Sequence, residues 1–306
     1  MKKLLAIVTV SILAVVFLGS SLFAAEKIVL KKYPDLKIGF TTTNFLTPLP
    51  VSMANAKKLI DWASDQGFAW IELRDPSAKL TLSECKELAA YAKGRNLEIG
   101  YAGQVGLMDP TFWEIFSRAV ANAPIFDGPK TLRTLSAGTE FGADPKKKAW
   151  TLQELYKAVK TANKAGNMAK SMGVQYVVEN SFEPLKGDGV TGFGATEFFA
   201  NVNSNVGWQM DTANFFAVSR VWTKPEDAKA FLEKNIGNLY YIHLKSSKEK
   251  KTTDILEENE LAIETILDIL VKNRIYYLAI ELPLKPKLED CQNNLLKSIE
   301  FLKKNY

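Results

Sequence analysis

The sequence predicts a single (β/α)₈ barrel, the TIM barrel, behind an N-terminal leader. Short apolar runs alternate eight times with amphipathic stretches of helical period, about thirty to forty residues apart, which is typical of parallel βαβ units. The chain beyond the leader is long enough for the roughly 250 residues that such a closed barrel needs. A doubly wound open sheet is the alternative, but no Gly-x-Gly-x-x-Gly turn follows the first apolar run. We therefore expect the closed barrel.

Each expected strand is a short run rich in apolar residues. The eight runs are residues 36–40, 68–73, 97–101, 131–135, 174–179, 206–211, 239–244 and 276–281. The amphipathic stretches predict helices at residues 54–66, 82–93, 110–121, 152–172, 196–203, 225–235, 261–272 and 293–304. Gly67 and Gly173 stand where helices end, and Thr81 or Ser83 stands where one begins. The fourth unit is less regular, because a polar loop over residues 138–148 follows its strand.

Residues 1–25 have the order of a secretory signal peptide. Lys2 and Lys3 form a basic head, no charged residue occurs from 4 to 25, and small residues precede Glu26. No clean Ala-x-Ala triplet marks a cleavage point, and the uncharged stretch is long enough to cross a bilayer if it stays uncleaved. We favour cleavage, which gives a signal peptide over residues 1–25 and a barrel domain over residues 26–306. The protein is then exported, periplasmic or secreted, and meets a membrane only if the leader is uncleaved.

The composition is that of an ordinary globular protein, with 47% hydrophobic and 24% charged residues. The formal net charge is +5, and no arginine-rich stretch or basic stripe occurs, so we expect no nucleic-acid partner. Cys85 and Cys291 are the only cysteines. They fall in separate segments interpreted as outer helices, which favours isolated thiols over a disulfide.

Four consecutive expected strands end on residues that can bind a metal ion, namely Glu179, Asp211, His243 and Glu281. In a parallel barrel the strand ends lie on one rim, where barrel active sites are built. Three carboxylates brought together there would repel one another, and a divalent cation would remove that penalty. His243 is the only histidine of the chain, and a histidine without acids near it would be a weak candidate for a metal ligand. Its place beside three acids predicts one divalent ion, Mn²⁺, Mg²⁺ or Co²⁺ in preference, with Zn²⁺ as a further option.

Other polar residues occupy positions from which they can reach a substrate. Lys245 lies two residues beyond His243, on the same side of the strand, and we expect it to polarise a substrate oxygen or to be an ordinary exposed lysine. Glu72 closes the second strand and Arg133 lies in the fourth, so both are candidates for the pocket or for an internal salt bridge.

Three residues in loops after the first and third strands, Asn44, Phe112 and Trp113, are weaker candidates for the substrate pocket. The aromatic rings of Phe112 and Trp113 have the flat apolar faces on which a sugar ring stacks. For all three, ordinary packing is the favoured interpretation.

The chain from about Ile38 to its C-terminus resembles the xylose isomerase-like TIM barrels, often called sugar phosphate isomerases/epimerases. The matching segments are residues 67–73, 172–180, 206–212, 241–245 and 278–281. In the ketose 3-epimerases of this group, the residues that match Glu179, Asp211, His243 and Glu281 bind the metal. The resemblance also implies that Glu179 and Glu281 move the proton.

The chain departs from the pattern of this group at two places. Many members read Asp-x-x-His after the sixth strand, with the histidine touching substrate, and this chain has Asn214 there. Many also read His-x-Lys-Asp after the seventh, and this chain has Ser246. The amide of Asn214 can donate and accept hydrogen bonds but cannot take up a proton at neutral pH. The four metal-site residues are retained, while the particular isomerase or epimerase activity stays open.

We therefore expect an exported, metal-dependent sugar isomerase or epimerase that removes a proton next to a carbonyl and passes through an enediolate. Its partner is a small-molecule sugar or keto-glycoside. A 3-keto-glycoside lyase, which eliminates a β-substituent at the same metal site, is the first alternative, and Asn214 and Ser246 leave room for it. A non-catalytic sugar-binding barrel is the second. An apurinic endonuclease is remote, because that class holds a metal cluster with many histidines.

Overall fold

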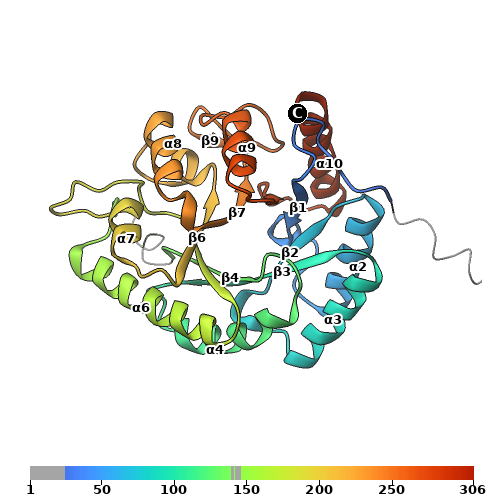
Figure 1. Ribbon diagram of the computed structural model, residues 1–306, viewed down its shortest axis with the longest axis horizontal. Coiled ribbons are helices and arrows are strands. Elements are labelled where there is room, and N and C mark those ends of the chain that lie inside the picture. The colour runs from blue at the N-terminus through green and yellow to red at the C-terminus, as the bar shows by residue number, and fades with distance from the viewer. Residues whose placement is uncertain (1–24, 139–140, 142–145) are drawn as a thin grey trace, which may run out of the picture.

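The computed structural model describes residues 25–138, 141 and 146–306, so the predicted leader (residues 1–25) lies outside the described part except for its last residue, as does most of the predicted polar loop. Eight parallel strands close into a barrel in the order β1-β10-β7-β6-β5-β4-β3-β2 (Figure 1). The strands are β1 Lys37–Thr41, β2 Trp70–Arg74, β3 Glu98–Gly106, β4 Thr131–Leu135, β5 Gln175–Glu179, β6 Val206–Asp211, β7 Leu239–Leu244 and β10 Tyr277–Ile280. The predicted (β/α)₈ barrel is confirmed.

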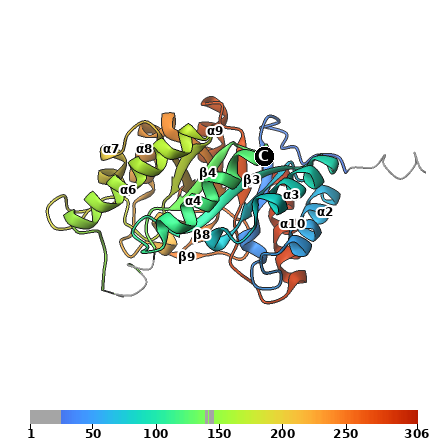
Figure 2. The ribbon, with the colours of Figure 1, turned by 90° about the horizontal axis from the view of Figure 1, so that it is seen from below.

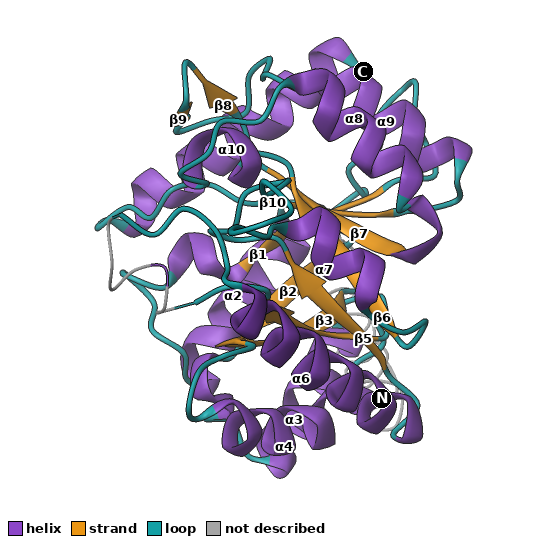
Figure 3. Ribbon diagram, turned by 90° about the vertical axis from the view of Figure 1, so that its left-hand side faces the viewer, coloured by secondary structure: helices purple, strands orange, loops and turns teal. Residues whose placement is uncertain are grey.

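Helices surround the strands on the outside (Figures 1 and 3). They are α2 Met53–Asp65, α3 Leu82–Gly94, α4 Phe112–Asn122, α6 Leu152–Ser171, α7 Ala195–Asn201, α8 Pro225–Lys234, α9 Ile263–Lys272 and α10 Leu288–Asn305. Neighbours in sequence are neighbours in space, as α3, α4 and α6 show along one flank of the molecule (Figure 2). Among the described residues, none of the helices has both the length and the apolar character that a membrane span requires.

Local sequence signals explain where these helices begin and end. Thr81 and Thr151 each accept a hydrogen bond from the backbone N–H three residues on, and a glutamate at that position closes the capping box. Gly67 and Gly173 adopt positive φ angles of 78° and 74° just after α2 and α6, as predicted for helix ends.

Two features of the strands differ from the prediction. Strand β3 continues to Gly106 rather than stopping at residue 101, with a register irregularity against β4 between Ala102 and Gly106. A two-stranded antiparallel hairpin, β8 Ser247–Lys248 and β9 Lys251–Thr252, follows β7 and stands apart from the barrel strands in Figure 3. Its polar residues gave no apolar alternation from which a strand could be predicted.

Trp70 fills the centre of the barrel below the strand ends. Its indole N–H donates to the carbonyl oxygens of Lys37, at 3.0 Å, and Leu278, at 3.3 Å. Gly39 leaves the room for it, since a Cβ there would lie 2.5 Å from Trp70 Cδ1. Tyr241 packs edge-on against the indole, with ring centroids 5.7 Å apart. The rim residues above therefore rest on a packed floor.

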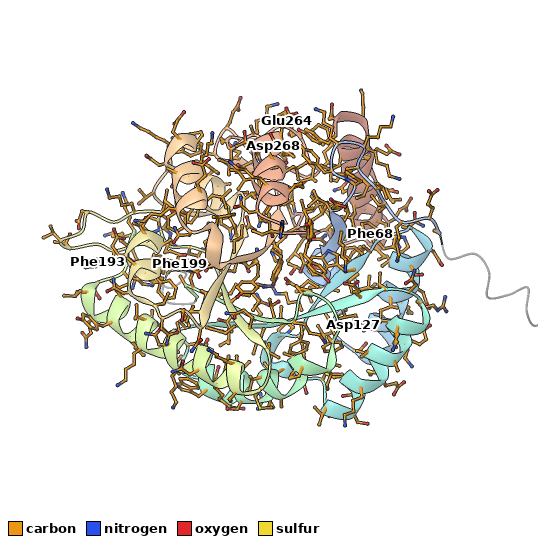
Figure 4. The ribbon with its side chains drawn as sticks, in the orientation of Figure 1. Phe68, Asp127, Phe193, Phe199, Glu264 and Asp268 are labelled. Atoms are coloured by element: carbon orange, nitrogen blue, oxygen red, sulfur yellow. The ribbon has the colours of Figure 1, made fainter. Side chains whose placement is uncertain are left out.

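The segment before β1 is bound to the outside of the barrel. Lys32 forms an ion pair with Glu264 at 2.8 Å, and Tyr33 Oη donates to Asp268 at 2.7 Å; both acids project from α9 (Figure 4). Cys85 on α3 and Cys291 on α10 are buried and free, which confirms two isolated thiols.

Candidate metal and substrate site

Four side chains converge on one point at the carboxyl ends of the strands. Glu179 ends β5, Asp211 ends β6, His243 lies in β7 and Glu281 follows β10, and these four strands are consecutive in the barrel. One ligand atom from each residue lies within 4.8 Å of the others, and all four residues are buried. Atoms that are each about 2.0–2.6 Å from one ion have separations of this size. The set therefore fits a single divalent cation.

The imidazole of His243 is oriented so that one nitrogen is available to such an ion. Its Nε2 donates to Glu72 Oε2 at 2.8 Å. Its Nδ1 lies 3.0 Å from Glu281 Oε2 and 3.6 Å from Glu179 Oε1, yet makes no hydrogen bond. A metal-binding histidine commonly donates its other N–H to a carboxylate, which fixes the ring and its tautomer. A buried Nδ1 that faces the carboxylates of Glu179 and Glu281 without forming a hydrogen bond of good geometry is thus an observation of this chain that favours the metal.

Glu72 and Arg133 lie beneath the site and hold its members in place. Arg133 is 1% exposed, donates to Glu72 Oε1 at 2.6 Å from Nη2, and pairs with Glu179 Oε2 through Nη1. Tyr241 Oη donates to Glu72 Oε2 at 2.7 Å. The prediction that Glu72 and Arg133 contact substrate is therefore corrected to its alternative, an internal salt bridge, because their polar atoms are occupied by the residues they position.

These contacts set the protonation of the buried groups. Burial opposes charge on His243, but Glu72, followed by Glu179 and Glu281, raises its pKa well above the ordinary value. Burial likewise opposes charge on Glu72, but Arg133 and His243 hold the pKa of that carboxyl below its usual range. In the metal-free protein His243 is therefore a cation between carboxylates.

Lys245 stands between two of the candidate metal-binding acids. Its Nζ lies 3.0 Å from Glu281 Oε1 and 3.4 Å from Asp211 Oδ2. Burial raises the pKa of Asp211 to about 6. The attraction of Lys245 opposes this rise, and repulsion from Glu281 adds to it. For Glu281 the attraction of Lys245 and His243 outweighs burial and holds the pKa well below the usual range. Lys245 is ion-paired, which removes the alternative of an ordinary exposed lysine.

A cavity of about 160 Å³ opens beside this cluster, lined by the predicted Glu179, Asn214, Lys245 and Glu281. The rest of its wall comes from Arg74, Gln104, Leu135, Ser181, Phe182 and Val218. The volume is below the roughly 300–1,000 Å³ of sites for drug-sized ligands, and it suits a molecule of monosaccharide size. Two hollows of about 330 Å³ lie between outer helices, and neither is lined by any of the four metal-binding residues.

Asn44 and Trp113 are not among the residues that line this cavity, so the structure agrees with the favoured interpretation of packing and does not place either residue as a substrate contact. Asn44 donates from Nδ2 to the carbonyl of Ile280 at 3.1 Å and accepts from the N–H of Leu282 at 2.9 Å, so it fixes the backbone on both sides of Glu281. Trp113 lies in the first turn of α4 rather than in a loop, and Lys164 Nζ sits 4.3 Å from its ring centroid.

The two departures from the family pattern have different surroundings. Asn214 lines the cavity, donates from Nδ2 to the carbonyl of Asn180 at 2.7 Å, and leaves its buried Oδ1 without a partner. Ser246 is buried, with its Oγ donating to the carbonyl of Glu257 at 2.8 Å and accepting from the N–H of that residue at 3.0 Å. The side chain of Asn214 is therefore placed to contact a substrate in the cavity, whereas that of Ser246 bonds to the backbone of its own loop at Glu257.

Arg74 and Gln104 are cavity residues that the sequence reasoning missed. Both lie at or near the ends of strands whose expected bounds were too short, at residues 73 and 101. Arg74 is two residues beyond Glu72, so the period-two alternation of a strand was a signal that places it on the same inner side. For Gln104 the irregular end of β3 removed that signal.

Fold and site together define a (β/α)₈ barrel with a three-carboxylate, one-histidine set suited to a divalent ion at its catalytic rim. The profile of the xylose isomerase-like TIM barrel family matches residues 60–304. The chain belongs to this family. No curated protein matches its sequence.

Solved structures share the fold at low sequence identity. A xylose isomerase-like TIM barrel protein from Mycobacterium smegmatis in complex with magnesium is 16% identical over 88% of this chain and 97% of its own, with a TM-score of 0.65. D-psicose 3-epimerase with D-tagatose, from Clostridium cellulolyticum H10, is 12% identical over 88% and 99%, with a TM-score of 0.61. The IolI protein with a bound zinc atom is 17% identical over 88% and 96%, with a TM-score of 0.60.

Proposed function

We propose that this chain is a divalent-metal-dependent isomerase or epimerase of small sugars that removes a proton next to a carbonyl group. The convergence of Glu179, Asp211, His243 and Glu281 beside a cavity of about 160 Å³ carries the proposal. Two structural neighbours, one a D-psicose 3-epimerase with D-tagatose and one a magnesium complex, support it. We further propose that the protein works outside the cytoplasm, on free sugars rather than on phosphorylated ones, because of the predicted signal peptide.

The four residues would hold one Mn²⁺, Mg²⁺ or Co²⁺ ion, or Zn²⁺, through three carboxylates and His243 Nδ1. Such an ion supplies Lewis-acid polarisation of a substrate carbonyl. The residues around it have to hold its ligands in position. Glu72 accepts the Nε2–H of His243 and fixes the ring, and Arg133 pairs with Glu179 and fixes that carboxylate.

Glu179 and Glu281 are the proposed proton carriers. Each carboxylate is held by a cation, Glu179 by Arg133 and Glu281 by Lys245. For Glu281 the charge of Lys245 lowers the pKa and favours the ionised form that a general base needs. The two acids come from strands separated by β6 and β7, so they approach His243 from different sides. One carboxylate takes the carbon-bound proton, and Lys245 stabilises negative charge on the adjacent substrate oxygen.

The fate of that proton decides the reaction. Return to the opposite face of the same carbon gives epimerisation, and return to the neighbouring carbon gives isomerisation. Loss of a β-substituent instead gives the lyase alternative. Asn214, which stands where many members have histidine, lines the cavity and leaves this alternative open.

The reaction is tested by incubating Mn²⁺-loaded protein with free ketoses and 3-keto-glycosides in D₂O. We expect deuterium in the recovered sugar without release of an aglycone, measured by NMR and mass spectrometry. Aglycone release would replace the proposal with the lyase, and absence of exchange from every compound would favour a binding protein.

Glu179→Gln and Glu281→Gln separate chemistry from binding. We expect each to reduce deuterium exchange at least 100-fold, since general-base catalysis contributes about 10²–10⁴-fold. Metal content is measured alongside, and Glu98→Gln, inside the barrel but at its opposite end with Lys37 and Tyr277, is the matched control. If both variants exchange deuterium at the rate of the control, neither glutamate moves the proton.

A further inference from the structure

Arg74 is a cation of the cavity wall that forms no direct ion pair among the described residues, although Glu281, Glu179 and Glu72 lie near enough to attract it. Its Nη1 donates to the hydroxyl of Thr43 at 2.7 Å, and its buried Nε has no hydrogen-bond partner. The guanidinium lines the cavity that contains Glu179 and Glu281. A buried polar group without a partner is costly, so a site that keeps an unpartnered Nε generally has a use for it.

The other cations of the site are ion-paired. Arg133 pairs with Glu72 and Glu179, and Lys245 pairs with Asp211 and Glu281. Arg74 is therefore the cation of the cavity wall whose guanidinium has no direct carboxylate partner among the described residues.

Resting on the proposed function, we infer that the substrate carries a carboxylate, and that Arg74 binds it while the reacting carbonyl faces the four-residue cluster. The substrate class is thus a keto sugar acid of monosaccharide size. A guanidinium presents N–H donors in a planar fork that matches a carboxylate. The unpartnered Oδ1 of Asn214 offers an acceptor for one of its hydroxyl groups.

A phosphate would meet a poorer match than a carboxylate. A phosphate monoester carries about 1.5 to 2 negative charges at neutral pH, whereas Arg74 offers a single positive charge. The small cavity also favours the more compact group. The two anions are nonetheless separate arms of the test.

The test is calorimetric binding to the Mn²⁺-loaded protein of D-fructuronate, D-fructose and D-fructose 6-phosphate. We expect D-fructuronate to bind at least 10-fold more tightly than either of the others. Arg74→Met should abolish that preference, and Arg74→Lys should retain part of it, because an ammonium keeps the charge but loses the fork. Arg95→Met removes a surface arginine paired with Asp61 and should leave the preference intact.

Equal affinity of the native protein for D-fructuronate and D-fructose overturns the inference, as does an undiminished preference in a folded Arg74→Met protein. Tighter binding of the phosphate overturns the choice of carboxylate. If Arg74 instead served the developing negative charge of the reaction, Arg74→Met would lower kcat for neutral and acidic sugars alike and leave their affinities unchanged. Selective binding of D-fructuronate without deuterium exchange would defeat the proposed function and leave this inference standing. Exchange confined to neutral sugars would support the proposed function and overturn this inference.

Discussion

At the scale of single residues, Glu72 shows how the site depends on groups that meet neither substrate nor metal. The residue lies in the middle of β2 and accepts hydrogen bonds from Arg133, Tyr241 and His243. Its position on the rim could be predicted from the sequence. Its role could not, because the sequence does not say which of several long polar side chains reach one another inside the barrel.

Glu72→Gln should weaken metal binding about 10- to 100-fold, the usual cost of changing the partner of a metal-binding histidine. The amide still fills the space but removes the negative charge that orients and polarises His243. Competition of Mn²⁺ with a chelating indicator measures the affinity. Glu98→Gln, which removes a carboxylate at the other end of the barrel, should leave it unchanged; equal losses in both variants would show a general effect of barrel packing.

At the scale of elements, the strands were predicted well where they are regular and poorly where they are not. The ends of β5 and β6 fall on Glu179 and Asp211 as expected, because apolar runs stop there. The end of β3 was placed five residues too early, because Tyr101 is followed by small and polar residues without a clear period. Gln104 was missed for this reason, whereas Arg74 was missed because the end of β2 was placed one residue too early; both line the cavity.

The inner face of β1 contributes a glycine that the packing of Trp70 requires. A Cβ on Gly39 would lie 2.4 Å from the carbonyl oxygen of Trp70 and 2.5 Å from its indole Cδ1. Gly39→Ala should therefore lower the free energy of unfolding by about 1–3 kcal/mol, the usual cost of overpacking. Gly94→Ala, at the end of α3 where a Cβ meets nothing within 4 Å, should be neutral or slightly stabilising. Urea unfolding of both variants measures the difference, and equal stabilities would contradict the packing argument.

At the scale of the whole molecule, the alternation of strands and helices was sufficient to predict the barrel, and the barrel was sufficient to bring distant residues together. Glu179 and Glu281 are far apart in sequence, yet both lie at the rim because every strand of the closed sheet runs in the same direction. The sequence could not predict that the metal-free site is held by protons and cations in place of the metal. Because a metal ion would displace these protons, metal binding should depend on pH.

Metal binding should release protons, since a divalent ion needs neutral His243 and ionised Asp211. In the metal-free protein the pKa of His243 is raised well above its ordinary value and that of Asp211 is raised to about 6. The folded metal-free chain thus holds both protons more tightly than the unfolded chain does. Its free energy of unfolding falls as pH rises from about 4 to 6 through Asp211, and falls again as pH passes the raised pKa of His243.

The metal-loaded protein lacks these protons, so the increase in Tm caused by Mn²⁺ should grow steadily from pH 5 to pH 8. Thermal unfolding with and without Mn²⁺ measures the increase, and calorimetry in two buffers of different ionisation enthalpy counts the protons released. Glu72→Gln removes the charge that most raises the pKa of His243, so it should release fewer protons at pH 7 than the native protein. A Tm increase that is constant across this pH range, with no proton release, would mean that the ion does not take the place of the protons on His243 and Asp211.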